Sequence, residues 1–323
     1  MFAWFGAMTT GNKLLEILYF FMGLIILYTG IKNLKDKKNP HAVGTAIFWC
    51  SLAAILIIGK PISMIVINKV KVGNIINGIL VVLMSLPAIF NKVAAGKGDM
   101  PNSKETKQRF DKIGMKVFIP AFCIGGFALA FALFTKLSAL VGVGVGVIVG
   151  AIILSYFDKR NTPKVYLDDS RRLLDLVGAL SMLPMLLGAL GAVFTAAGVG
   201  QVVANLVGYI IPKGNITMGI IIYAIAMAVF TMIMGNAFAA ITVITVGIGY
   251  PFVLAYGANP VIIGSLALTC GYCGTLCTPM AANFNIVPVA ILEMKDKNGV
   301  IKKQILPAIL ILLFQIGYML IAK

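Results

Sequence analysis

Two apolar segments in the second half of the chain carry the residues best suited to bind a solute. The first is TMIMGNAFAA (Thr231 to Ala240), in which Gly235 permits a turn and the Asn236 side chain can donate or accept hydrogen bonds. The second is LTCGYCGTLCTPMAANFNIVP (Leu268 to Pro288). It combines helix breakers with neutral polar residues, namely Gly271, Gly274, Pro279, Thr269, Thr275, Thr278, Asn283 and Asn285. We expect both segments to interrupt helices.

Interrupted helices inside a membrane expose backbone groups that can bind ions and solutes. Non-helical backbone at membrane depth is tolerated only where it lines a cavity or is buried in protein. A broken helix leaves free carbonyl groups on one half and free amide groups on the other. Neutral oxygens suit Na⁺, whereas positive helix N-termini suit an anionic group. Paired interruptions are typical of secondary transporters, and the alternative for each segment is a packing kink without a ligand.

The composition requires a membrane around these segments. Of the 323 residues, 60% are hydrophobic and 12% are charged, which is about half the charged share of a soluble domain. In water such a chain would expose large apolar patches. The net charge of +16 does not indicate a nucleic-acid surface, because the basic residues lie in short loops between apolar runs. The sequence therefore predicts an all-α polytopic membrane protein.

The apolar runs predict about eight crossings, one re-entrant hairpin and one discontinuous helix. About 20 apolar residues cross a hydrocarbon core about 30 Å thick. We expect ordinary crossings at 13–31, 42–59, 72–90, 117–135, 137–157, 173–197 and 304–322. The uncharged stretch 216–255 is expected to form a hairpin that turns at Gly235–Asn236, with two full crossings as the alternative. The stretch 261–292 is expected to form the discontinuous helix.

The distribution of Lys and Arg predicts the orientation in the cell membrane. Four loops, at 32–41, 91–116, 158–172 and 293–303, carry 20 of the 27 basic residues. Basic loops prefer the cytoplasmic side, so we expect both termini outside. We interpret the charged cluster Asp168, Asp169, Arg171 and Arg172 as a cap and anchor at the start of the sixth crossing. Glu16 and Asp175 are interpreted as interfacial charges.

Other kinds of site fit the sequence less well. Cys270, Cys273 and Cys277 have a spacing that resembles a metal site, but structural zinc needs four Cys or His ligands and the only histidine is His41. Neither segment holds an Asp or Glu, which favours Na⁺ over H⁺ as coupling ion. An intramembrane enzyme is an alternative whose candidate nucleophiles are Ser181 and the three cysteines. A non-transporting scaffold subunit is another. We expect no catalytic residue, no metal site and no cofactor besides a Na⁺ coupling ion.

At the two segments the sequence resembles the ion transporter superfamily, which includes divalent-anion/sodium symporters and citrate and gluconate permeases. MGNAFAA resembles the Ser-Asn-Thr motif at a hairpin tip, with Asn236 at the Asn position. It departs from the motif at Gly235 and Ala237, which replace the Ser and the Thr. GTLCTPMAANFNI resembles the Thr-Pro break of the following discontinuous helix, with Thr278–Pro279 at the break and Asn283 or Asn285 at the later polar positions.

Nearly the whole chain resembles an uncharacterised bacterial permease family, known only as a domain of unknown function. The matching stretches are DDSRRLLDLVGALSMLP, FTMIMGNAFAAITVITVGIG and CGTLCTPMAANFNIVPVAILEMKDKNGVI. The resemblance implies that 113–323 is a transporter repeat of three spans, hairpin, broken helix and final span, like the second repeat of the superfamily. Residues 1–112 would then be a three-span scaffold with a cytoplasmic loop.

The superfamily site needs two hairpins and two broken helices, and this chain supplies one of each. The resemblance therefore implies one half of an inverted-repeat transporter, completed by a second membrane subunit. The implied solute is a small carboxylate such as 5-oxoproline. The expected solute and ion site consists of Gly235, Asn236, Ala237, Gly274, Thr275, Thr278, Pro279, Asn283 and Asn285.

Overall fold

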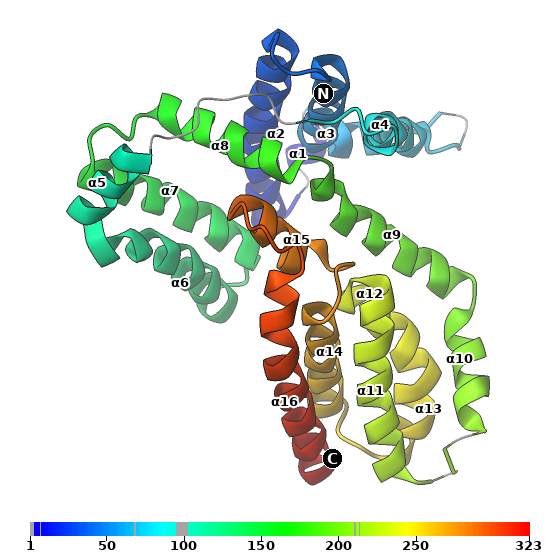
Figure 1. The fold of residues 1–323 in the computed structure, drawn as a ribbon. Helices are drawn as coiled ribbons and strands as arrows, with labels where there is room; N and C mark the ends of the chain where they lie inside the picture. The colour runs from blue at the N-terminus through cyan, green and yellow to red at the C-terminus, as the bar shows by residue number, and fades with distance from the viewer. Residues whose placement is uncertain (1–2, 7, 68, 95–102, 210, 213) are drawn as a thin grey trace. The chain divides into compact units, whose positions relative to one another are not determined.

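The chain is helical along the whole of its described length (Figure 1). The computed structural model describes residues 3–6, 8–67, 69–94, 103–209, 211–212 and 214–323, so residues 95–102 of the predicted basic loop lie outside it. The helices are α1 (Ala3–Gly6), α2 (Thr10–Lys35), α3 (Ala42–Ser63), α4 (Val72–Ile89), α5 (Ser103–Ile113), α6 (Phe118–Phe134), α7 (Ala139–Phe157), α8 (Pro163–Val177), α9 (Leu183–Ala196), α10 (Val199–Gly208), α11 (Ile216–Met234), α12 (Ala237–Ile244), α13 (Tyr250–Phe252), α14 (Pro260–Leu276), α15 (Ala282–Ile291) and α16 (Gly299–Ala322). The predicted all-α class is confirmed.

Eight stretches of the described chain are long and apolar enough to cross a membrane, which confirms a polytopic membrane protein. They are Thr10–Lys35, Ala42–Ser63, Val72–Ile89, Phe110–Phe134, Ala139–Phe157, Ile216–Met234, Ala237–Tyr256 and Gly299–Ala322. The seventh stretch contains α12, a π-helical segment (Thr245–Gly249) and α13. Many large apolar side chains on these stretches are exposed, as expected of surfaces that face lipid.

The chain forms two compact units, Met1–Gly178 and Ala179–Lys323. In the first unit α2 packs on α3 and α3 on α4, α6 pairs with α7, and both α7 and α8 contact α2. Phe48 and Trp49 of α3 are fully buried, with their rings edge to face at 4.9 Å. The predicted division at residue 112 describes a repeat rather than a compact unit, and it stays a prediction.

The predicted crossing at 173–197 is wrong, because the helix ends inside it. Gly178 ends α8 with a φ of 51°, which only glycine adopts readily. A short 3₁₀ segment and α9 follow, and Gly198 (φ 71°) then separates α9 from α10. Residues Ala189–Ala196 and Val199–Gly208 are apolar enough for one crossing together, with a bend of 64° between them. The apolar run 173–197 is therefore distributed over the end of α8, the 3₁₀ segment and α9.

The charged residues of α8 lie inside the helix, which starts at Pro163, so the capping part of the prediction for this cluster is wrong. Their role as an anchor of the orientation stays a prediction, and several of them form a structural network. The guanidinium of Arg171 lies 3.1 Å from the Asp36 carboxylate and 3.4 Å from that of Asp175. The Asn33 amide also donates to Asp175 at 2.7 Å. Asp175 is buried rather than interfacial, and its burial raises the pKa of its carboxyl group. These contacts hold α8 against α2.

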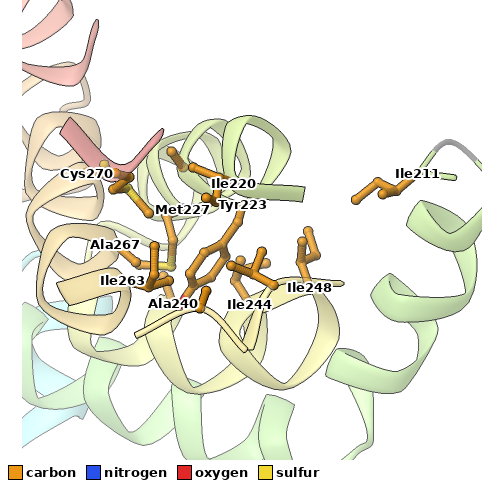
Figure 2. Packing of buried hydrophobic residues seen from close by; sticks show 14 residues of the cluster. Ile211, Ile220, Tyr223, Met227, Ala240, Ile244, Ile248, Ile263, Ala267 and Cys270 are labelled. Atoms are coloured by element: carbon orange, nitrogen blue, oxygen red, sulfur yellow. The ribbon is translucent and has the colours of Figure 1, made fainter. Parts of the chain in front are cut away.

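The second unit is built around α11, which packs on α14, α12 and α16. Figure 2 shows its core, where Ile220, Tyr223 and Met227 from α11 meet side chains from α12, the π-helical segment and α14. The Tyr223 hydroxyl satisfies its hydrogen-bonding capacity inside this apolar core by bonding to Thr245 at 2.6 Å. This core fixes the helices that carry the two interrupted segments.

Candidate functional site

The first interruption lies at Gly235–Asn236, where the sequence predicts a turn. Gly235 ends α11 in the left-handed conformation (φ 71°), and its N–H donates to the Thr231 carbonyl at 2.7 Å. Asn236 is extended, and its side-chain oxygen accepts from the N–H groups of Phe238 (2.9 Å) and Ala239 (3.3 Å). These bonds cap α12 and fix which side-chain atom is the oxygen. Each arm of the predicted hairpin has the length of a crossing, so the two-crossing alternative also fits.

Capping commits the Asn236 oxygen and leaves the amide nitrogen as the atom that can meet a ligand. No partner for this nitrogen occurs among the described residues. An amide NH₂ group donates two hydrogen bonds and accepts none. The expectation from the residue type alone was a group able to donate or accept. In the folded chain Asn236 offers a donor, which suits an anion better than a cation.

The second interruption is the loop between α14 and α15, which is held closed by Asn285. The Asn285 amide nitrogen donates to the backbone carbonyls of Thr275 (2.7 Å) and Thr278 (2.6 Å). The Thr278 hydroxyl accepts from the Met280 N–H at 3.2 Å. Asn285 is fully buried, and its side-chain oxygen has no hydrogen-bond partner in the described chain. Through its two hydrogen bonds Asn285 therefore fixes the backbone geometry of the loop between α14 and α15.

The two interruptions meet at a cavity of about 270 Å³. Gly235 lies directly against the Met280 backbone, where a β-carbon would clash with the Met280 carbonyl. The cavity is lined by Gly235, Asn236, Ala237 and Phe238 from the first interruption, Tyr272, Thr275, Ala281, Ala282, Asn283 and Phe284 from the second, and Leu183 of α9. The two segments thus face one shared space in the second unit.

Five of the nine predicted site residues line the cavity, and four do not. The lining members are Gly235, Asn236, Ala237, Thr275 and Asn283. Gly274 packs instead against the α11 backbone at Ala228, so it allows the two helices to approach closely. Thr278 and Asn285 are buried within the break, and Pro279 is exposed. That any of these residues binds a solute or ion stays a prediction.

Among the described residues no charged side chain lines the cavity, and the polarity of its wall comes from helix ends. The last turns of α11 and α14 reach the cavity at Gly235 and Thr275. The N-termini of α12 and α15 both line it, through Ala237 and Phe238 on one side and Ala282 and Asn283 on the other. Each helix N-terminus carries roughly half a positive charge. No side chain caps α15, so its first N–H groups have no partner within the helix. The Thr275 carbonyl, which could offset this polarity, already accepts from Asn285.

Six lining residues were missed by the sequence reasoning, namely Leu183, Phe238, Tyr272, Ala281, Ala282 and Phe284. Phe238 and Tyr272 form an edge-to-face pair with ring centroids 5.9 Å apart, and they place apolar surface on the cavity wall. Tyr272 lies three positions before Thr275, so helical periodicity places both on one face and could have identified it. Leu183 comes from α9, and no local pattern indicates its position.

The three clustered cysteines belong to the packing of α14. Cys270 is buried in the core around α11, and the Cys273 thiol lies 3.8 Å from the Gln315 side-chain oxygen. In the described ranges no group of three or more His, Cys, Asp or Glu side chains is arranged to hold a metal ion.

The fold and the cavity define a class: a polytopic helical membrane protein in which two interrupted segments enclose a small cavity lined by neutral residues. The chain belongs to a family described as "Protein of unknown function (DUF979)", whose model matches residues 16–323. No curated protein and no solved structure matched the chain.

Proposed function

We propose that this protein is a carrier subunit that moves a small carboxylate across a membrane, with the cavity between the two interruptions as its solute site. The observation that carries the proposal is the convergence of two helix N-termini on one cavity free of charged side chains. Half-helix N-termini that point at an anionic solute are a recurring device in secondary transporters. The resemblance of both segments to the ion transporter superfamily supports the same conclusion.

The cavity size favours a compact solute. A water molecule takes about 30 Å³ in the liquid, so a cavity of about 270 Å³ has room for about nine waters or for one compact organic molecule. A molecule such as 5-oxoproline, the solute that the family resemblance implies, fits this space. The uncapped N–H groups of α15 and the Asn236 amide would bind the carboxylate. The Phe238 and Tyr272 rings would contact the apolar part of the solute.

We further propose Na⁺ as the coupling ion, although the Asn236 oxygen is occupied by capping. Two buried neutral oxygens near the interruptions have no partner in the described chain, the Thr231 hydroxyl and the Asn285 side-chain carbonyl. Such oxygens suit Na⁺, and their lack of a donor costs about 1–3 kcal/mol each while they remain unpaired. We assign no catalytic step to the cavity.

The proposal includes a second membrane subunit and an orientation. One pair of interrupted segments makes half of an inverted-repeat site, so the partner would supply the other half. The four basic loops would face the cytoplasm, with both termini on the outside of the cell membrane. The proposed carboxylate site lies within the second unit of this chain, so it requires neither the partner nor this orientation.

Ligand-dependent stability of the purified protein tests the proposal most directly. A ligand that binds only the folded state raises the unfolding temperature. We expect small carboxylates of the size of 5-oxoproline to raise it, more so with Na⁺ present than with K⁺. Uptake into proteoliposomes, with and without the partner, then tests transport. Equal unfolding temperatures with carboxylates, their amides and no ligand would refute the solute site.

A further inference from the structure

A second cavity lies in the first unit, where α3 begins and α4 ends. It is a groove of about 560 Å³, about twice the volume of the solute cavity. Its lining residues are Asn39, Pro40, His41, Ala42, Val43, Gly44, Ile47, Leu83, Leu86, Pro87, Phe90 and Lys92. Because α3 and α4 are consecutive and antiparallel, the groove lies at the membrane face from which α3 starts. The loops at this face, 32–41 and 91–116, are among the basic loops predicted to be cytoplasmic.

The polar end of the groove is built by hydrogen bonds that hold two loops against the start of α3. The Asn39 amide donates to the Asn33 side-chain oxygen (3.1 Å) and to the Ala94 carbonyl (3.0 Å). The Thr45 hydroxyl donates to the same carbonyl at 3.1 Å. Gly44 packs directly against the Lys92 backbone, where a β-carbon would clash. Asn39 and Thr45 are both buried, so this end of the groove is preformed.

The groove at this end is lined by the first turn of α3 and by the Lys92 side chain, and the Lys92 carbonyl lies against Gly44. No side chain caps α3, whose first turn at Val43 and Gly44 lines the groove. Lys92 is exposed beside it. The carbonyls at the end of α4 are occupied, since the N–H groups of Phe90 and Lys92 donate back to Leu86 and Pro87.

Among the described residues no Asp or Glu lines the groove, so none of them competes for the first N–H groups of α3 or for Lys92. The nearest acid in sequence is Asp36. Its carboxylate forms an ion pair with the Arg171 guanidinium at 3.1 Å and accepts a hydrogen bond from the Lys38 N–H at 3.0 Å. The polar end of the groove therefore presents positive charge that the described chain leaves without a carboxylate partner.

The remainder of the groove is apolar and faces outward. Ile47, Leu83 and Leu86 line it with exposed fractions of 37%, 43% and 43%, and Phe90 is exposed to 66%. Ile47, Leu83 and Leu86 sit on helices long and apolar enough to cross a membrane, so we expect them to face lipid. A molecule that fills the groove would need an anionic head at one end and a hydrocarbon chain at the other.

We infer that this groove binds an anionic phospholipid of the cytoplasmic leaflet. The lipid phosphate contacts Lys92 and the first turn of α3, and an acyl chain lies against Ile47, Leu83 and Leu86. Basic pockets between membrane helices on the cytoplasmic side recognise anionic head groups. The groove of about 560 Å³ has room for a lipid phosphate and part of an acyl chain. This site is separate from the solute cavity, and its lining residues all belong to the first unit.

Native mass spectrometry of the purified full-length protein tests the inference. The probes are phosphatidylglycerol and phosphatidylcholine with identical chains. We expect retained phosphatidylglycerol at a defined stoichiometry and little retained phosphatidylcholine. Lys92→Ala should weaken phosphatidylglycerol binding about fivefold, since a lysine near an anionic membrane surface contributes about that factor. Lys60→Ala is the matched control, because Lys60 is exposed in the last turn of α3, at the end opposite to the groove.

Two further experiments test whether the bound phosphate belongs to a lipid or to a soluble anion, and whether the apolar wall contacts an acyl chain. Inorganic phosphate at equal concentration should not displace the lipid, and displacement would assign the site to a soluble anion and overturn the inference. Leu83→Ser should weaken binding of long-chain lipid more than binding of a short-chain analogue. Equal retention of both lipids, or equal effects of Lys92→Ala and Lys60→Ala, would also overturn it.

Discussion

The Asn236→Ser variant separates the two roles that the structure gives to Asn236. The Asn236 oxygen caps α12 through N–H bonds of 2.9 and 3.3 Å. The amide nitrogen takes no part in capping and is the atom that we propose to bind the ligand. Serine retains an acceptor that can cap a helix, so α12 should start at the same residue and stability should change by only a few tenths of a kcal/mol. Serine lacks the amide donor, so any hydrogen bond to a bound carboxylate is lost.

The expected loss of affinity follows from the charge on the solute. A hydrogen bond to a charged group contributes about 1.5–3 kcal/mol, which corresponds to a dissociation constant about 10- to 150-fold higher. The assay is calorimetric titration of the purified protein with the carboxylate that stabilises it most. Asn236→Ala should lose the same affinity and also about 1 kcal/mol of stability, because the cap is removed as well.

The chain provides a matched control in Asn259. Its side-chain oxygen caps α14 through N–H bonds of 3.0 and 3.3 Å, nearly the geometry of Asn236, and it does not line the solute cavity. Asn259→Ser should bind the carboxylate like the wild type. Unchanged affinity in a folded Asn236→Ser variant would refute the donor role. An equal loss in Asn259→Ser would show that capping, and not the cavity, controls the measurement.

Three further predictions concern the break, the helix contact and acid stability. Asn285→Leu should lower the stability of the purified protein by about 2–4 kcal/mol in thermal unfolding, because two buried carbonyls lose their donor. Gly274→Ala should cost about 1–3 kcal/mol through its clash with α11, whereas Gly264→Ala, which has open space around it, should cost nothing or stabilise; equal losses would contradict the contact. Hydrogen bonds from Arg160 lower the pKa of Asp158 to about 2, so the stability that this carboxylate adds above its ordinary pKa of about 3.9 should be lost as the pH falls toward 2. The difference in unfolding temperature between wild type and Asp158→Asn should therefore shrink from pH 5 to pH 2.5, and a constant difference would contradict it.

The positions of both interruptions could be predicted because their causes are local. Glycine, proline and asparagine end and start helices through their own backbone and side-chain chemistry, and the turn lies at Gly235–Asn236 as that chemistry requires. The role of Asn285 could not be predicted, since it depends on how α15 folds back on α14. Residue type shows that an asparagine can bind a ligand, but the fold decides which of its atoms remains available.

The end of α8 and the groove between α3 and α4 could not be predicted from the sequence, for a different reason. An apolar run from 173 to 197 satisfies the length of a crossing, and nothing in its composition distinguishes Gly178 from a glycine inside a membrane helix. The groove joins the start of α3 to the end of α4, more than 40 residues apart. Such contacts between distant segments arise from helix packing, and the periodicity of a single segment does not predict them.

The contact between Gly235 and the Met280 carbonyl has a consequence for how this family could diversify. At Gly235 and Met280 the two interruptions touch through main chain, which is the same whatever the neighbouring side chains are. The side chains that shape the cavity, such as Tyr272 and Phe238, are not among the nearest atoms of this contact. Substitution at those positions could therefore change the preferred solute while the joint between the two halves of the site keeps its geometry.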